Sequence, residues 1–145
     1  MTAPVFVDTN VFIYAVDRAD AHKHRAAREW RDDLWKSRLG RTGFQVLQEF
    51  FINVTQKALA SRDDARAEVR DLLSWNPVPV SALTLERGWK IQHRYKVSFW
   101  DALVVAAATQ ASCGYLLTED LQAGQDFDGV VVVDPFRVGP DAILT

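Results

Sequence analysis

Three short apolar segments, far apart in the chain, constrain the fold of this protein most strongly. They are Val5 to Val7, Tyr115 to Thr118 and Val130 to Asp134, and the last two carry apolar residues at successive positions without polar alternation. Strands of this kind are buried on both faces, as in parallel sheets that helices cover. Because helical patterns fill the chain between them, the sequence predicts an α/β fold, a three-layer α/β/α arrangement around a mostly parallel central sheet.

The helices are predicted from apolar spacing and from polar start and stop signals. They are expected at 11–16, 18–41 with a stop at Gly40, 44–59, 62–75, 83–95 and 99–111, with short extended pieces at 41–42 and 78–80. The segment 119–129, between the last two strands, is expected to be a loop. No internal repeat or linker is visible, and 145 residues, 48% of them hydrophobic, predict one domain over 1–145.

Charge and cysteine content narrow the class of protein. The formal net charge of -2 is not that of a typical nucleic-acid binder, although a site built from carboxylates would itself lower the total charge. Cys113 is the only cysteine, which excludes an internal disulfide and a cysteine-rich zinc site. With no signal peptide and no apolar run long enough to span a bilayer, the protein is expected to be soluble and cytoplasmic.

Four acidic residues lie at positions where an α/β sheet places ligands. Asp8 follows the first strand, Asp120 follows the strand at 115–118, Asp101 lies in the first turn of the apolar helix at 99–111, and Glu49 lies one to two turns into another helix. Ligands of open α/β sheets bind outside the carboxyl ends of the strands. These four side chains are therefore expected to converge at one edge of the sheet.

Each acid has a simple structural explanation when it is taken singly. Acids near helix starts are stabilised by free backbone N–H groups, and Ser98 to Asp101 has the spacing of a capping box. The combination is harder to explain in this way, because gathered carboxylates repel one another unless a cation neutralises them. Oxygen ligands select Mg²⁺ or Mn²⁺, and such sites commonly serve phosphate chemistry, so the sequence predicts metal-assisted phosphoester hydrolysis.

Four motifs carry a resemblance to a known family. They are "VFVDTNVFIYAV", a Q-x-x-x-E-F pattern at Gln45 to Phe50, "SFWDALVVAAA" and "YLLTEDLQ". In this order and spacing they resemble the acidic motifs of the PIN-domain nucleases, and are most similar to the single-domain VapC-type toxins of toxin–antitoxin pairs. The resemblance implies a metal-dependent endoribonuclease that acts on RNA, is often a homodimer, and is inhibited by a small antitoxin protein.

The resemblance also implies roles for individual residues. The acids that match the family's catalytic and metal-binding positions are Asp8, Glu49, Asp101 and Asp120. Asn10 and Thr118 match polar positions that orient those acids. Asp120 is preferred to the adjacent Glu119 as the inward acid, because its spacing after the strand fits the family better.

Other residues suggest weaker hypotheses. His22, His24 and His93 are not expected to be catalytic. His22 and His24 lie two residues apart in a helix, so they do not face the same way, and neither shares a strand end with the acids. Arg41, in a run of basic residues, is the best candidate for an RNA contact, although a solvated helix face explains that run equally well.

Tryptophan is abundant, and three of the five invite separate interpretations. Trp30 and Trp35 are expected to be partly exposed, since their helix is highly charged. Trp100 precedes Asp101 and could either pack or stack on a base.

Two alternative functions remain open from the sequence. One is a catalytically silent module with this fold that binds RNA or protein, which loss of an acid would indicate. The other is a Mg²⁺-dependent phosphatase of the haloacid-dehalogenase type, which fits less well because Asn10 occupies the position where that family has a second aspartate.

Overall fold

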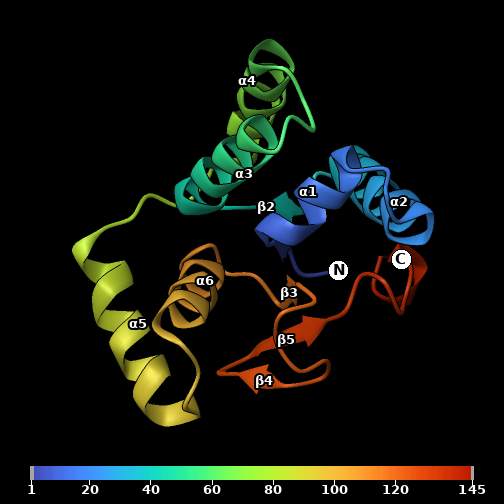
Figure 1. The fold of residues 1–145 in the computed structure, drawn as a ribbon. Coiled ribbons are helices and arrows are strands. Elements are labelled where there is room, and N and C mark those ends of the chain that lie inside the picture. The colour runs from blue at the N-terminus through green and yellow to red at the C-terminus, as the bar shows by residue number, and fades with distance from the viewer. Residues whose placement is uncertain (1, 145) are drawn as a thin grey trace.

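The computed structural model describes residues 2–144, so the two end positions of the predicted domain lie outside the described residues. Its centre is a five-stranded sheet (Figure 1). The strands are β1 (Val5–Val7), β2 (Gly40–Arg41), β3 (Tyr115–Leu117), β4 (Asp126–Phe127) and β5 (Val130–Val133), in the spatial order β2-β1-β3-β5-β4. All neighbours are parallel except β4 and β5, which are antiparallel. The predicted α/β fold with a mostly parallel sheet is confirmed.

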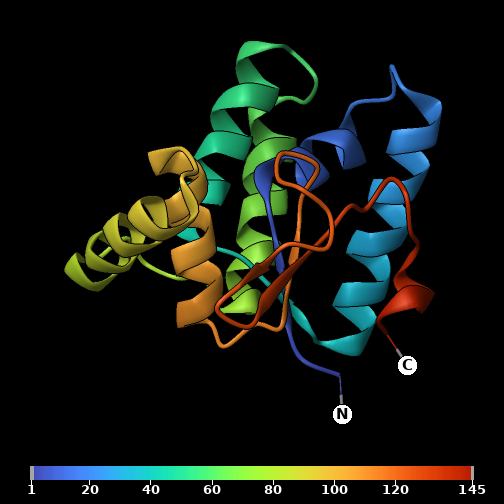
Figure 2. The same cartoon turned by 90° about the horizontal axis from the view of Figure 1, so that it is seen from below.

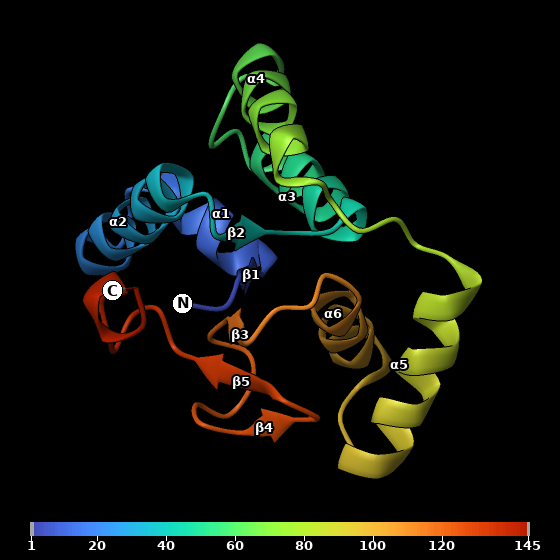
Figure 3. The same ribbon diagram turned by 180° about the vertical axis from the view of Figure 1, so that it is seen from behind.

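Helices flank the sheet on both sides. They are α1 (Thr9–Val16), α2 (Ala21–Ser37), α3 (Phe44–Gln56), α4 (Arg62–Leu72), α5 (Ala82–Tyr95) and α6 (Phe99–Gln110), with short 3-10 turns at Leu73–Trp75 and Pro140–Ala142. Figures 1 and 3 show α1 and α2 on one side of the sheet and α6 on the other, with α5 outside α6. Figure 2 shows α3 and α4 as a helical hairpin beside this assembly.

Polar caps set the helix starts. Asp8 caps α1 by accepting a hydrogen bond from the Thr9 N–H, so this helix begins two residues earlier than the apolar pattern predicts. Serines cap three further helices, and Ser81 forms a capping box with Thr84 at the start of α5. The same mechanism fixes the start of α6, where the Ser98 hydroxyl accepts from the backbone N–H of Asp101.

The predicted helix stop at Gly40 is wrong. Helix α2 ends at Ser37, because Arg38 adopts the left-handed conformation with φ of 62°. Gly40 instead begins strand β2, where the ring of Trp75 lies so close that a Cβ on residue 40 would come within 2.5 Å of it. The glycine is needed here for close packing and not for helix termination.

The sequence predicted a loop over the whole of 119–129, and this prediction is wrong in part, because the segment contains strand β4. Phe127 pairs with Val130, so only Asp128 and Gly129 connect the two strands. Both connecting residues have positive φ, of 52° and 100°. An Asp-Gly pair with this conformation is the tight hairpin turn whose twist matches that of the strands. The signal for β4 was therefore present in the sequence.

One apolar core lies around the sheet. Its largest fully buried side chains include Phe6, Phe12, Trp30 and Phe50. The expectation that Trp30 is partly exposed is wrong, because its ring is buried and its Nε1–H donates to the carbonyl oxygens of Pro135 and Val138. Trp35, from the same helix, is 39% exposed, as expected. Among the described residues, no helix has the length and apolar character needed to cross a membrane.

Candidate metal centre

Asp8 is the most buried acid of the candidate site. It leaves the end of β1, where its backbone N–H donates to the carbonyl oxygen of Leu117 on the neighbouring strand at 3.1 Å. The side chain is 7% exposed and accepts hydrogen bonds from the Thr9 N–H and from the Thr118 hydroxyl, at 2.7 and 2.8 Å. The end of the first strand thus presents a fixed carboxylate at the carboxyl edge of the sheet.

Burial changes the protonation of this carboxylate. The pKa of Asp8 is raised from 3.8 to about 6, mainly by burial, and the hydrogen bonds from Thr118 and Thr9 only partly offset that effect. The negative charges of Asp120 and Glu49 make a smaller contribution to this rise. Two of the other three predicted acids therefore act electrostatically on Asp8. A cation bound here would offset both the cost of burying the Asp8 charge and the repulsion between the carboxylates.

Thr118 connects the first acid to the last. Its buried hydroxyl donates to Asp8 and accepts from the Asn10 amide at 3.0 Å and from the Asp120 N–H at 3.1 Å. The same Asn10 amide donates to the Asp120 carboxylate at 3.2 Å. Thr118 and Asn10 are thus joined by hydrogen bonds to the carboxylates of Asp8 and Asp120, respectively.

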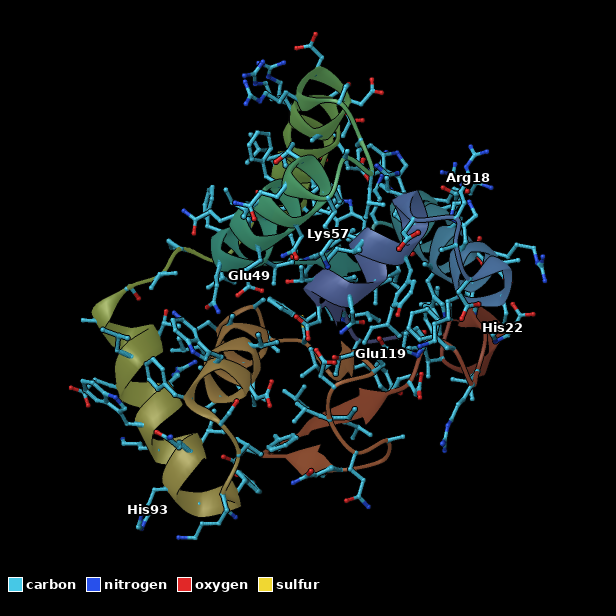
Figure 4. All side chains as sticks on the ribbon, in the orientation of Figure 1. Arg18, His22, Glu49, Lys57, His93 and Glu119 are labelled. Atoms are coloured by element: carbon cyan, nitrogen blue, oxygen red, sulfur yellow. The ribbon has the colours of Figure 1, made fainter. Side chains whose placement is uncertain are left out.

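Glu49 reaches the site from α3. Its carboxylate accepts from the Thr9 hydroxyl at 2.9 Å and from the Gln45 amide at 3.3 Å, and Asn53 bonds to its backbone carbonyl. Figure 4 shows Glu49 on the side of α3 that faces α6. The contact from Thr9 was not predicted, although the residue's position directly after Asp8 is a usable signal.

Asp101 is not joined to the other three acids by any hydrogen bond within residues 2–144. It lies in the first turn of α6, and its backbone N–H is bonded to the Ser98 hydroxyl, as the capping spacing predicts. Its carboxylate is partly exposed and accepts no hydrogen bond from the described part of the chain. Its charge is not among those that raise the pKa of Asp8. Asp101 is thus the acid that is freest to bind a ligand.

The adjacent acids Glu119 and Asp120 point to different partners. The Glu119 carboxylate forms an ion pair with the Lys23 ammonium at 2.7 Å, whereas Asp120 is bonded to Asn10. Lys23 in turn lies over the rings of Tyr14 and Phe136, at 4.9 and 5.2 Å from their centres. Lys23 is 96 residues from Glu119, so no local pattern could have predicted this contact.

The histidines and Arg41 lie away from the acids. His22 and His24 bond to the carbonyl oxygens of Phe136 and Tyr14. Figure 4 shows His22 and His93 far from Glu49, on opposite sides of the molecule. The Arg41 guanidinium donates to the carbonyl oxygens of Arg38 and Gly40, near the start of β2 and not at the strand ends that carry the acids.

The donor atoms at this edge fit a hard cation in chemical kind. All of them are oxygens, and within residues 2–144 no lysine or arginine forms an ion pair with Asp8, Glu49, Asp101 or Asp120. The buried Asn10 Oδ1 has no hydrogen-bond partner in the described structure, which leaves one acceptor for a hydrated ion.

The side chains are not drawn together around a common point, however. No group of three or more acidic, histidine or cysteine residues among positions 2–144 is arranged to hold a metal ion as the side chains stand. Thr118, Thr9 and Asn10 instead each donate a hydrogen bond to one of the carboxylates. Their O–H and N–H groups place partial positive charge against the carboxylates, where a bound cation would place a full positive charge.

The family of the chain follows from a comparison with protein-family models. The model of the PIN domain matches residues 5–125, a range that includes β1, the Glu49 helix, the start of α6 and the Thr118 to Asp120 segment. The chain therefore belongs to the PIN domain family. A comparison with curated protein sequences finds no match.

Solved structures with a similar fold include proteins of bacterial toxin–antitoxin systems. A toxin–antitoxin complex from Klebsiella pneumoniae is similar with a TM-score of 0.63 and 18% identity, over 90% of this chain and 97% of the other. VapBC2 from Rickettsia felis, bound to a DNA fragment from its promoter, has a TM-score of 0.60 and 14% identity, over 89% and 96% of the two chains. The Mycobacterium tuberculosis toxin VapC20, which cleaves the sarcin–ricin loop, has a TM-score of 0.57 and 21% identity, over 77% and 86%.

Proposed function

We propose that this chain is a metal-dependent endoribonuclease that hydrolyses RNA phosphodiester bonds with Mg²⁺ or Mn²⁺, and that it is the toxin of a toxin–antitoxin pair. Residues 1–145 would form one nuclease domain. The observation that carries the proposal is that Asp120 and Glu49 lie near enough to the buried Asp8 for their charges to raise its pKa, while no lysine or arginine within residues 2–144 pairs with any of the three. Membership of the PIN domain family supports the nuclease, and the toxins of similar fold support the biological role.

The four acids would bind the metal ion, and neighbouring polar residues would hold the acids in position. Asp8, Glu49, Asp101 and Asp120 would hold the ion, which when bound would neutralise their charge, activate a water and stabilise the leaving oxygen of the phosphodiester. Thr118 and Asn10 keep the carboxylates of Asp8 and Asp120 in place. Because the Asp101 carboxylate accepts no hydrogen bond from residues 2–144, it can move toward a ligand at little cost. The site needs no nucleophilic side chain.

The partner in the proposal is an antitoxin, and the surface that best fits it lies between α3 and α4. A groove of about 410 Å³ runs there, with apolar walls that include Phe44, Ile52 and Leu73, each at least 40% exposed. Arg66 and Arg70 flank the groove, so an amphipathic segment with acidic residues would fit it. A segment bound there would contact the helix that carries Glu49. A homodimer and an RNA contact by Arg41 are further parts of the proposal.

A cleavage assay tests the function. The purified protein would be incubated with a mixture of labelled RNAs in Mg²⁺ or Mn²⁺, with EDTA, and as the Asp101→Asn variant. We expect cleavage that stops with EDTA and falls by at least about 100-fold in the variant, because a metal-binding acid is lost. The matched control is Asp63→Asn, which alters a highly exposed acid on α4 and should cleave normally. Cleavage that survives EDTA would overturn the metal mechanism, and no cleavage would favour a silent binding module.

A further inference from the structure

Trp100 is unusually exposed for its residue type. It is 64% exposed, the highest value among the large apolar side chains of the described residues. Tryptophan is highly buried on average, because its large apolar surface is costly to leave in water. Among residues 2–144, the only ring contact of Trp100 is with Phe99, edge to face, with ring centres 5.6 Å apart. The remaining indole surface is therefore available to a ligand.

The position of Trp100 ties this surface to the acids. It is the second residue of α6 and directly precedes Asp101. Helix α6 leads into β3 and ends near its start, so the beginning of α6 lies toward the edge where β3 delivers Thr118 and Asp120. Trp100 therefore lies one residue from Asp101, at the end of α6 that is nearer to this edge of the sheet.

Electrostatics limits the ways in which this site can bind RNA. The acids around Asp8 carry negative charge, and the chain as a whole has a net charge of -2. A polyanion gains little from the average field of such a surface, so contacts that do not depend on charge must supply affinity beside the acids. Aromatic rings supply it, because every nucleic-acid base has a flat face on which an indole can stack.

We propose that Trp100 is a substrate-contact residue whose indole stacks on a base next to the cleaved phosphodiester. The inference rests on the proposed function and deepens it, since it assigns the binding of an unpaired nucleotide to one named side chain. A base inside a duplex is already stacked on its neighbours, so this contact selects RNA that is single-stranded or looped at the cleavage point.

Steady-state kinetics with a single-stranded RNA substrate tests the proposal. Trp100→Ala should raise KM by roughly 5- to 100-fold with little change in kcat, the loss expected for one base–aromatic stack. Trp100→Phe should recover most of the affinity, because a smaller ring still stacks. The matched control is Trp89→Ala, since Trp89 is 51% exposed on α5, outside α6 (Figures 1 and 3), and should leave both constants unchanged.

The outcomes separate the inference from the function. Normal cleavage by the wild type with an unchanged KM for Trp100→Ala would overturn the stacking role alone, whereas no cleavage by the wild type would overturn both. Sedimentation analysis of the same variants tests whether another copy of this chain, instead of RNA, covers the Trp100 ring. A smaller assembly for Trp100→Ala than for the wild type would show that the ring serves a subunit interface, and would overturn the base contact.

Discussion

The Thr118 hydroxyl donates to Asp8 over 2.8 Å, joining residues that follow two adjacent parallel strands. The same oxygen accepts from Asn10 and from the backbone of Asp120, so one buried hydroxyl holds the first and last acids of the site. The geometry of the candidate metal centre thus depends on pairing between β1 and β3. The sheet aligns the residues, and the threonine fixes their side chains.

Replacing Thr118 should therefore weaken the site more than the fold. The Thr118→Val variant removes the hydroxyl that bonds to Asp8, to Asn10 and to the Asp120 N–H. Each of these groups then lacks a hydrogen-bond partner, which should cost about 1–3 kcal/mol of stability. RNA cleavage should fall by roughly 10- to 100-fold, as when groups that orient metal ligands are removed. Thr118→Ser keeps the hydroxyl and is the control. Equal cleavage by Thr118→Val and the wild type, compared at saturating Mg²⁺, would contradict this role.

The raised pKa of Asp8 predicts a pH dependence of stability. The folded pKa is about 6 and the usual value is 3.8, so folding favours the protonated form, and this stabilisation is present at low pH. It is lost as the pH rises from about 4 through 6, by an amount on the order of 3 kcal/mol. Urea unfolding of the metal-free protein in EDTA should show this loss, and Asp8→Asn should lack it. Parallel pH profiles for the two proteins would be evidence against the raised pKa.

The two adjacent acids should respond differently to the same change. Asp120→Asn should reduce cleavage strongly, because its carboxylate faces Asn10 and Asp8, whereas Glu119→Gln should keep most of the activity. Glu119 is partly exposed and pairs with Lys23, so losing its charge should cost less than about 1 kcal/mol. Initial cleavage rates and thermal melts of both variants test this, and a larger loss of cleavage in Glu119→Gln would reverse the assignment.

Close packing at Gly40 gives a prediction about stability alone. A methyl group there would meet the Trp75 ring at 2.5 Å, and this ring is only 6% exposed. Gly40→Ala should therefore destabilise the protein by about 1–3 kcal/mol, as other overpacked cores do. Gly139→Ala is the matched control, because nothing lies within 4 Å of the added methyl group. Equal urea midpoints for the two variants would show that Trp75 can move aside.

The sequence predicted the sheet and the positions of the acids because both depend on local patterns. Apolar runs gave β1, β3 and β5, and the residues that follow β1 and β3 include Asp8 and Asp120. Features that depend on distant contacts were not predictable in this way. The pairing of Lys23 with Glu119, the burial of Trp30 and the packing of Trp75 on Gly40 all join residues far apart in the chain. The missed strand β4 differs, since its Asp-Gly turn was visible locally.

Metal binding tests the central claim most directly, because the four acids are proposed to hold a divalent ion. Mn²⁺ binding to the purified protein can be measured by titration calorimetry, together with Asp8→Asn, Asp120→Asn and Glu119→Gln. We predict saturable binding by the wild type, at least about tenfold weaker binding in the first two variants, and nearly unchanged binding in the third. No saturable binding by the wild type, or equal binding by all four proteins, would contradict the proposed metal centre.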